Sequence, residues 1–317
     1  MRAKRCPYLY CTNVKKIGAR NGRQRHYCHD CHKSWTAAAR PKRKVDRLWQ
    51  QYAFDGRPVK SLAKEYKKSA GCIRAQLRAY VPPRIVQKPR TAAVIMDVTY
   101  FGDFGMLVVI DPYVDSQAGE NTVLYYAVLS GTERTVDYEV ATDTIEAMGY
   151  SILAVTIDGR RGVRTMLEAR GIPVQHCQFH QLMTITQCLT KRPRLVQNVE
   201  LRTIALTLAR TDELTFEGAL AGWYKCHGRW LKERDPVTKR WAHERTRRAY
   251  FSLCRNLPYL FTYQHDYIQE SGLRVANTTS PLDGRFGVWK DKLIAHRGAS
   301  KQRTITILCS FFSRTTD

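Results

Sequence analysis

The sequence predicts a mixed α/β fold preceded by two small N-terminal domains, and three observations along the 317 residues lead to this prediction. Four cysteines fall within the first 31 residues, apolar residues then recur at helical spacing, and strand-like runs appear from residue 91. The N-terminal part is also strongly basic. Residues 1–90 hold 24 of the 52 Lys and Arg but 4 of the 28 Asp and Glu, a net +20, which leaves +4 for residues 91–317. Such an excess favours a polyanionic partner.

Residues 1–38 contain a cysteine array that predicts a small zinc ribbon. Two pairs with metal-ligand spacing, Cys6-x4-Cys11 and Cys28-x2-Cys31, supply four thiolates, which is a ligand set of closed structural zinc sites. The alternatives are cysteines that bind no metal, or a histidine in place of one cysteine. The candidate histidines are His26, His29 and His32. In a module with so little core, Zn²⁺ would supply most of the folding energy.

Residues 45–82 predict a three-helix domain of the helix-turn-helix type. Helical spacing recurs in 45–54, 61–68 and 69–80, with Ser61 and Ser69 as N-caps of the last two helices. The third helix would read DNA, because Arg and Gln side chains form bidentate contacts with guanine and adenine edges in the major groove. The residues expected to contact DNA are Lys68, Arg74, Gln76 and Arg78. A plain three-helix linker domain is the alternative.

From residue 91 the strands and helices follow the order of an RNase H-like core, which is strand, strand, strand, helix, strand, helix, strand. The strand-like runs are 92–101, 105–114, 121–130, 151–158 and 172–179, and the helical stretches are 132–150 and 159–171. Residues 181–270 carry helical signals only. We therefore expect a first part of the core in 91–180, a helical insertion in 181–270 and a last part of the core in 271–317.

Three acidic residues lie where a metal-dependent site for phosphoryl transfer would need them. Asp97 lies in the middle of a predicted strand, Asp158 ends one, and Asp283 comes just before a helical stretch over 284–297. Carboxylates from distant segments hold divalent ions for this chemistry, and a mid-strand carboxylate is costly to bury without a cation or partner. Alternatively these residues cap turns, since Asp-Gly is a common turn dipeptide. Glu270 is a less favoured alternative to Asp283.

Five short motifs give the chain a family resemblance. They are MDVTYFG (96–102), IDGRRG (157–162), CQFH (177–180), NTTSPLDG (277–284) and HRG (296–298). In this order, after a cysteine array and a helix-turn-helix pattern, they resemble DDE-type bacterial insertion-sequence transposases of the IS256/Mutator-like group. One position departs from the family pattern: the third acid is Glu in the family and Asp283 here, one methylene shorter.

The resemblance implies an enzyme that cleaves DNA at the ends of a mobile element and joins the strands to a target. It implies two Mg²⁺ ions, with Asp97 touching both and Asp158 and Asp283 holding one each. The expected partners are double-stranded DNA, as terminal inverted repeats and as target, and further copies of the chain in a dimer or higher oligomer on DNA. The open alternatives are a catalytically weak DNA-binding regulator and an RNase H-fold nuclease without strand transfer.

Other residues are assigned supporting roles. The resemblance gives Cys177 and His180 a role in supporting the site, with a core cysteine and a hydrogen-bonded histidine as the alternative. Basic residues after the third acid would lie near the phosphate backbone, namely Arg285, Lys290, Lys292 and Arg297. Interleaved basic and aromatic residues in 223–248 either stack on unpaired bases or form an amphipathic helix.

The sequence predicts a prokaryotic, cytoplasmic protein associated with the nucleoid. No apolar run approaches the ~20 residues needed to cross a bilayer, and the start of the chain lacks the apolar stretch of a secretory signal.

Overall fold

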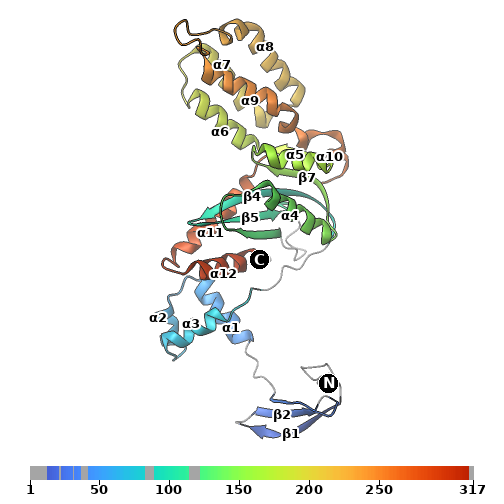
Figure 1. Cartoon of the computed structure of the whole chain (residues 1–317), viewed down its shortest axis with the longest axis vertical. Coiled ribbons are helices and arrows are strands. Elements are labelled where there is room, and N and C mark those ends of the chain that lie inside the picture. Colours follow the sequence, from blue (N-terminus) through green and yellow to red (C-terminus); the bar gives the residue numbers. More distant parts are fainter. Residues whose placement is uncertain are drawn as a thin grey trace. The chain divides into compact units, whose positions relative to one another are not determined.

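The computed structural model describes residues 13–20, 23–30, 32–36, 42–82, 89–113 and 122–313. The chain divides into two compact units, Met1–Val81 and Pro82–Asp317, and Figure 1 traces both.

The first unit begins with a three-stranded antiparallel sheet in the order β1-β2-β3, formed by Val14–Arg20, Arg23–Cys28 and Ser34–Thr36. Gly18 has a φ of 95° at an irregularity in the pairing of β1 with β2, a conformation that glycine adopts at little cost. Cys28 is buried at the end of β2, where its N–H donates to Lys33 O at 3.0 Å. Cys6, Cys11 and Cys31 lie outside the described residues, so the zinc ribbon stays a prediction.

Three helices follow in the same unit: α1 (Lys42–Trp49), which continues as a π-helical turn over Gln50–Phe54, α2 (Val59–Glu65) and α3 (Ala70–Arg78). Ser69 caps α3 as predicted, because its Oγ accepts from Cys72 N at 3.2 Å. The predicted cap at Ser61 is wrong. Helix α2 begins two residues earlier, directly after Pro58, and the Ser61 hydroxyl accepts from Arg57 instead.

The second unit is built around a five-stranded mixed sheet, which confirms an α/β fold. Its strands are β4 (Thr91–Phe101), β5 (Phe104–Ile110), β6 (Val123–Leu129), β7 (Ser151–Ile157) and β8 (Val174–His176). They run in the order β6-β5-β4-β7-β8, with antiparallel pairs on the β6 side of β4 and parallel pairs on the β8 side. The last predicted strand, 172–179, is too long, because a helix already begins at Gln178.

Helices cover both faces of this sheet (Figure 1). Helices α4 (Thr135–Ala147) and α5 (Arg161–Ala169) pack on one face, where Val94 and Met96 belong to the main core cluster. On the other face Ala93 and Ala154 pack against Ile268 and Val275. Because side chains alternate along a strand, Ile95 and Asp97 share this second face with Ala93. The C-terminal helices α11 (Ser280–Ile294) and α12 (Lys301–Phe312) follow, with α11 against β4.

Residues between β8 and α11 form a helical segment with a core of its own. Its long helices are α6 (Gln178–Leu189), α7 (Val196–Leu206), α8 (Glu213–Leu231) and α9 (Glu244–Leu260), and its short ones are η3 (Leu208–Arg210), η4 (Thr262–Gln264) and α10 (Asp266–Glu270). Buried Gln175 of β8 joins this segment to the sheet by donating to Leu260 O, and Gln178 of α6 donates to the same carbonyl. None of the helices in the described residues is both long and apolar enough to cross a membrane.

Candidate active site

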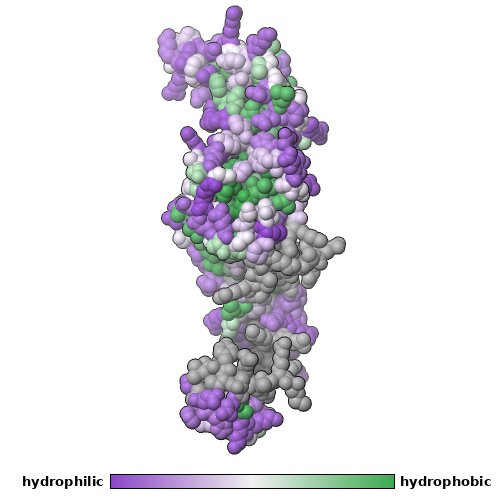
Figure 2. Space-filling view, turned by 90° about the vertical axis from the view of Figure 1, so that its right-hand side faces the viewer, coloured by the Kyte–Doolittle hydropathy of each residue, from purple (hydrophilic) through white to green (hydrophobic). Residues whose placement is uncertain are grey.

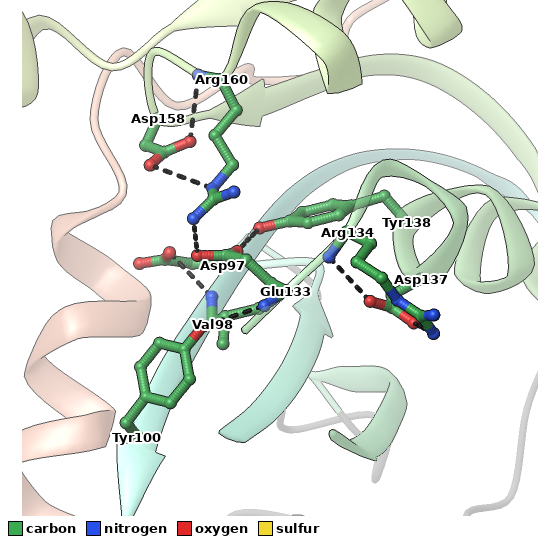
Figure 3. A network of polar contacts seen from close by, with 9 residues as sticks. All are labelled: Asp97, Val98, Tyr100, Glu133, Arg134, Asp137, Tyr138, Asp158 and Arg160. Carbon is green, nitrogen blue, oxygen red and sulfur yellow. Dashed lines mark hydrogen bonds and ion pairs between the residues drawn. The ribbon is translucent and has the colours of Figure 1, made fainter. Parts of the chain in front are cut away.

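Asp97 and Asp158 lie next to each other because their strands are parallel neighbours. The register pairs Ala93 with Ala154 and Ile95 with Thr156, so its continuation by two residues sets Asp97 beside Asp158. Asp158 follows the last residue of β7, where the chain turns toward α5. Figure 3 places both carboxylates at this end of the sheet.

Asp283 comes to the same place from the C-terminal part of the chain. The sequence predicted it just before a helix, but it lies in the first turn of α11, which begins at Ser280. Pro281 explains the earlier start, because proline suits the first helical turn, where its missing N–H has no partner to lose. Helix α11 packs against β4, and the negative charge of Asp283 acts on Asp97. The structure therefore brings the three predicted carboxylates together.

The environment of Asp97 opposes its ionisation. Burial raises its pKa to about 7, and the negative charges of Asp283 and Asp158 act in the same direction. Two groups act the other way: Val98 N–H donates to Asp97 Oδ1 at 2.8 Å, and His180 lies close enough to lower the pKa. A cation bound beside these three carboxylates would favour the charged form.

A fourth acid, Glu133, joins the site through a polar network that sequence reasoning missed (Figure 3). Glu133 accepts hydrogen bonds from the Tyr138 hydroxyl and from the Arg160 guanidinium, and its own N–H donates to Tyr100 Oη at 3.0 Å. Arg160 also contacts Asp158, with Nε 3.9 Å from Oδ2. Burial raises the pKa of Glu133, and the charge of Asp158 adds to the rise. The sequence gives no signal that Glu133 belongs to this site, because a glutamate just before a helix is common and carries no motif.

Cys177 and His180 hold the segment that leads into α11. Thr279 is fully buried between them and Asp283: its N–H donates to Cys177 Sγ at 3.2 Å, and its Oγ1 lies 3.5 Å from His180 Nδ1. The same hydroxyl donates to Asp283 Oδ2 at 3.0 Å. Gln178, next to Cys177, accepts from Asn277 Nδ2 and donates its N–H to Asn277 O, both at 3.0 Å. The CQFH and NTT motifs thus form one hydrogen-bonded unit behind the third acid.

The pKa values of Cys177 and His180 shift in opposite directions because the two side chains are hydrogen-bonded. The hydrogen bond to Cys177 raises the pKa of His180 to about 9, against the effect of burial. Burial raises the pKa of Cys177, but its hydrogen bonds with His180 and Thr279 outweigh this and lower it overall. A protonated His180 therefore places a positive charge near Asp97 and Asp158, which both help to keep it protonated.

The residues present suit a hard divalent cation such as Mg²⁺, which prefers carboxylate oxygen ligands. Asp97 is a half-buried carboxylate whose raised pKa comes chiefly from its removal from water and is lowered only in part by the charge of His180. In this structure each of the three acids contacts a different group of the protein. Asp97 accepts a hydrogen bond from the Val98 N–H, Asp158 forms an ion pair with Arg160, and Asp283 accepts a hydrogen bond from the Thr279 hydroxyl. In line with this, within the described ranges no three His, Cys, Asp or Glu side chains form a group able to hold one metal ion as they stand.

The basic residues predicted to contact DNA lie in different settings. Lys68, Arg74 and Arg78 are exposed in the first unit, while Gln76 is half-buried beside Cys72. In the second unit Lys290, Lys292 and Arg297 are exposed on or just after α11. Arg285 differs, because it is half-buried and donates to Thr122 Oγ1, which makes it an anchor of α11 rather than a surface cation.

Gly159 gives the loop after Asp158 room to approach β8. A Cβ added at Gly159 would lie 2.8 Å from Cε1 of the buried His176. We expect Gly159→Ala to displace the loop that carries Asp158, and to lower the free energy of unfolding in urea by about 1–3 kcal/mol. Gly131→Ala, where an added Cβ meets nothing within 4 Å, is the control. Equal losses in the two variants would contradict this account.

Comparison with known proteins found no family model that matches the chain and no curated protein similar to it.

Proposed function

We propose that this chain is a metal-dependent DNA transposase that binds the ends of a mobile element, cleaves them and joins the strands to a target. One observation carries the proposal: β4, β7 and α11 bring Asp97, Asp158 and Asp283 together on one face of the sheet. Carboxylates that come from distant segments and converge at one half-buried position are suited to holding the divalent ions of phosphoryl transfer. The family resemblance of the surrounding motifs supports the same chemistry.

The fold and the first unit support the proposal in two further ways. The strand order β6-β5-β4-β7-β8, with three antiparallel strands followed by two parallel ones, is the arrangement expected of an RNase H-like core. The first unit carries most of the net positive charge of the chain and a capped helix, α3, that exposes Arg74 and Arg78. As a helix-turn-helix beside a zinc ribbon, it would recognise the terminal repeats.

The mechanism assigns separate tasks to the residues of the site. Asp97, Asp158 and Asp283 would hold two Mg²⁺ ions, which when bound supply positive charge to the scissile phosphate and lower the pKa of water. Thr279 orients the carboxylate of Asp283 through its hydroxyl. Arg160 neutralises Glu133 and so limits the negative charge next to Asp158. Exposed cations of α11 and the following turn, Lys290 and Arg297, would bind DNA phosphates.

A catalytically weak regulator is the second candidate, favoured by the shorter third acid. Asp283 accepts from the Thr279 hydroxyl of its own first turn, and an aspartate reaches less far from α11 than a glutamate would. Asp283→Glu separates the two functions, since it should raise strand cleavage in a regulator that has lost its third ligand.

A strand-transfer assay tests the proposal. Purified protein, Mg²⁺ or Mn²⁺ and DNA with the inverted repeats that flank the coding sequence are incubated with a target plasmid, and the joined 3′ ends are sequenced. We expect joined products for the natural chain, none for Asp158→Asn or Asp283→Ala, and unchanged DNA binding in both variants. Asp143→Asn, on the exposed side of α4, is the matched control. Cleavage without joining would indicate a nuclease, and equal loss of binding and cutting would remove Asp158 from the metal site.

A further inference from the structure

The connection between α8 and α9 forms a small ordered hairpin, residues 232–243. Arg234 and Trp241 pair across it in an antiparallel bridge. Asp235 holds the turn, because its carboxylate accepts from Val237 N at 3.0 Å and from Thr238 N at 2.6 Å. A hairpin closed in this way presents its side chains in a fixed arrangement, which lowers the entropic cost of binding a partner.

Trp241 of this hairpin lies between two arginines. The guanidinium carbon of Arg234 is 3.2 Å from the centre of the Trp241 ring, and that of Arg247 on α9 is 3.8 Å from it. Two guanidiniums so close to one ring centre would collide on the same side, so they cover opposite faces. Arg247 also lies 4.8 Å from the Phe251 ring. The indole thus acts as a spacer that fixes two cations in place.

This arrangement does not favour the first of the two interpretations of 223–248, in which the aromatic residues stack on unpaired bases. Both faces of Trp241 are occupied, Trp223 is buried against Tyr250, and Trp230 stacks on His243 with ring centres 3.6 Å apart. The alternative considered from the sequence, aromatic side chains that serve packing while the charges face water, describes these three residues. The groups of this surface that are accessible to a binding partner are therefore the arginine side chains rather than these three aromatic rings.

Two acids of the region are engaged within it, and a third, Glu244, is exposed in the first turn of α9. Asp235 is used by the turn, and Glu233 accepts from His243 Nε2 at 3.0 Å. The nearby arginines have no carboxylate partner among the described residues; they are Arg234, Arg240, Arg245, Arg247 and Arg248, here called the hairpin arginines. In Figure 2 hydrophilic side chains cover most of the upper end, where α8 and α9 lie in Figure 1.

We propose that the hairpin arginines bind the phosphate backbone of duplex DNA and so form a DNA contact separate from the first unit and from α11. Guanidiniums form forked hydrogen bonds with phosphate oxygens, and those already stacked on an aromatic ring lose little freedom on binding. The geometry of the arginines supports binding to a phosphate-bearing polyanion, and the choice of DNA as that polyanion rests on the proposed function. Because both faces of the Trp241 ring are covered and the contact is made by guanidiniums to phosphates, it should not depend on DNA sequence.

The test measures binding of the full chain to a short, labelled, mixed-sequence duplex by fluorescence anisotropy over a range of salt concentrations. Arg234→Gln with Arg247→Gln should weaken binding several-fold and reduce the salt slope by roughly two, because each lost phosphate contact releases about one counterion fewer. Arg192→Gln with Arg194→Gln is the control, since both are exposed between α6 and α7 and remove the same charge. An equal effect of the two pairs, or none from the first, would overturn the proposal.

Trp241→Leu provides a second readout that leaves the charge unchanged. Without the ring the two guanidiniums lose their fixed positions, so duplex affinity should fall about threefold while the thermal unfolding midpoint stays close to that of the natural chain. Full affinity in a folded Trp241→Leu protein would contradict the spacer role. A loss confined to single-stranded RNA would reject duplex DNA as the partner. Asp143→Asn, the control of the strand-transfer assay, should leave all these binding values unchanged. Duplex binding is measured without cleavage, so the outcome of this test does not depend on the outcome of the strand-transfer assay.

Discussion

Replacing Asp97 with Asn is expected to abolish DNA cleavage and, at about pH 8, to stabilise the folded protein. The asparagine side chain would have nearly the same shape but no negative charge, so it would neither bind a divalent cation strongly nor oppose its own burial. The loss of activity follows from the closeness of Asp97 to the carboxylates of Asp158 and Asp283, whose charges both act on it. The gain in stability follows from removing a charge that the fold disfavours.

The pH dependence of this effect follows from the pKa of Asp97, which chiefly burial raises from 3.8 to about 7. Because the folded state holds the proton more tightly than the unfolded state, protonation stabilises the fold. That stability is fully present below the unfolded value of 3.8 and is lost as the pH rises through about 7. The difference between the two pKa values corresponds to about 4 kcal/mol, which is an upper limit where the site admits water.

Urea unfolding at about pH 5 and pH 8 measures the effect. The natural chain should lose stability between these values relative to Asp97→Asn, and added Mg²⁺ should restore it at the higher pH in the natural chain only. Asp291→Asn is the matched control, because this exposed aspartate is also in the second unit and lies on α11. A parallel pH dependence in the natural chain and Asp97→Asn would show that Asp97 does not carry the buried charge.

Local patterns were enough to predict the elements that hold two of the three carboxylates. The strand-like run in 92–101 and the apolar run in 151–157 predicted β4 and β7, which the chain connects through β5, β6 and α4. The helical insertion was also predicted, although its first helix begins at Gln178. That start depends on a tertiary contact, since Gln178 N–H donates to Asn277 O from a segment far along the chain.

The parts of the site that were missed depend on contacts between distant segments. Glu133 becomes part of the acidic cluster only because Arg160 and Tyr138 hold its carboxylate. Likewise, nothing in the sequence around Trp241 reveals that Arg247, on the next helix, covers one face of its ring. Periodicity and spacing report on local structure, whereas these pairings arise when the elements pack.

Thr279→Val is expected to lower strand cleavage by about a hundredfold while leaving the fold intact. The change keeps the size of the side chain but removes the hydroxyl that donates to Asp283 Oδ2 at 3.0 Å and faces His180 Nδ1. Because Thr279 is fully buried, water does not replace the lost donor. The carboxylate of Asp283 would then lose the contact that orients it, and a displacement of even ~1 Å at a reacting centre has effects of this size.

The expected cost in stability is about 1–3 kcal/mol, for the polar groups left without the Thr279 hydroxyl at Asp283 and His180, and is smaller than the cost in activity. Cleavage rates at saturating DNA, together with urea unfolding, separate the two effects. Thr278→Val is the control, because this neighbour is half-buried and its hydroxyl has no hydrogen bond within the described residues. Thr279→Ser, which restores the hydroxyl without the methyl group, should recover most of the rate. If Thr279→Ser is as slow as Thr279→Val, packing of the methyl group rather than orientation of Asp283 explains the defect, and the hydrogen-bonded unit of CQFH and NTT is then structural only.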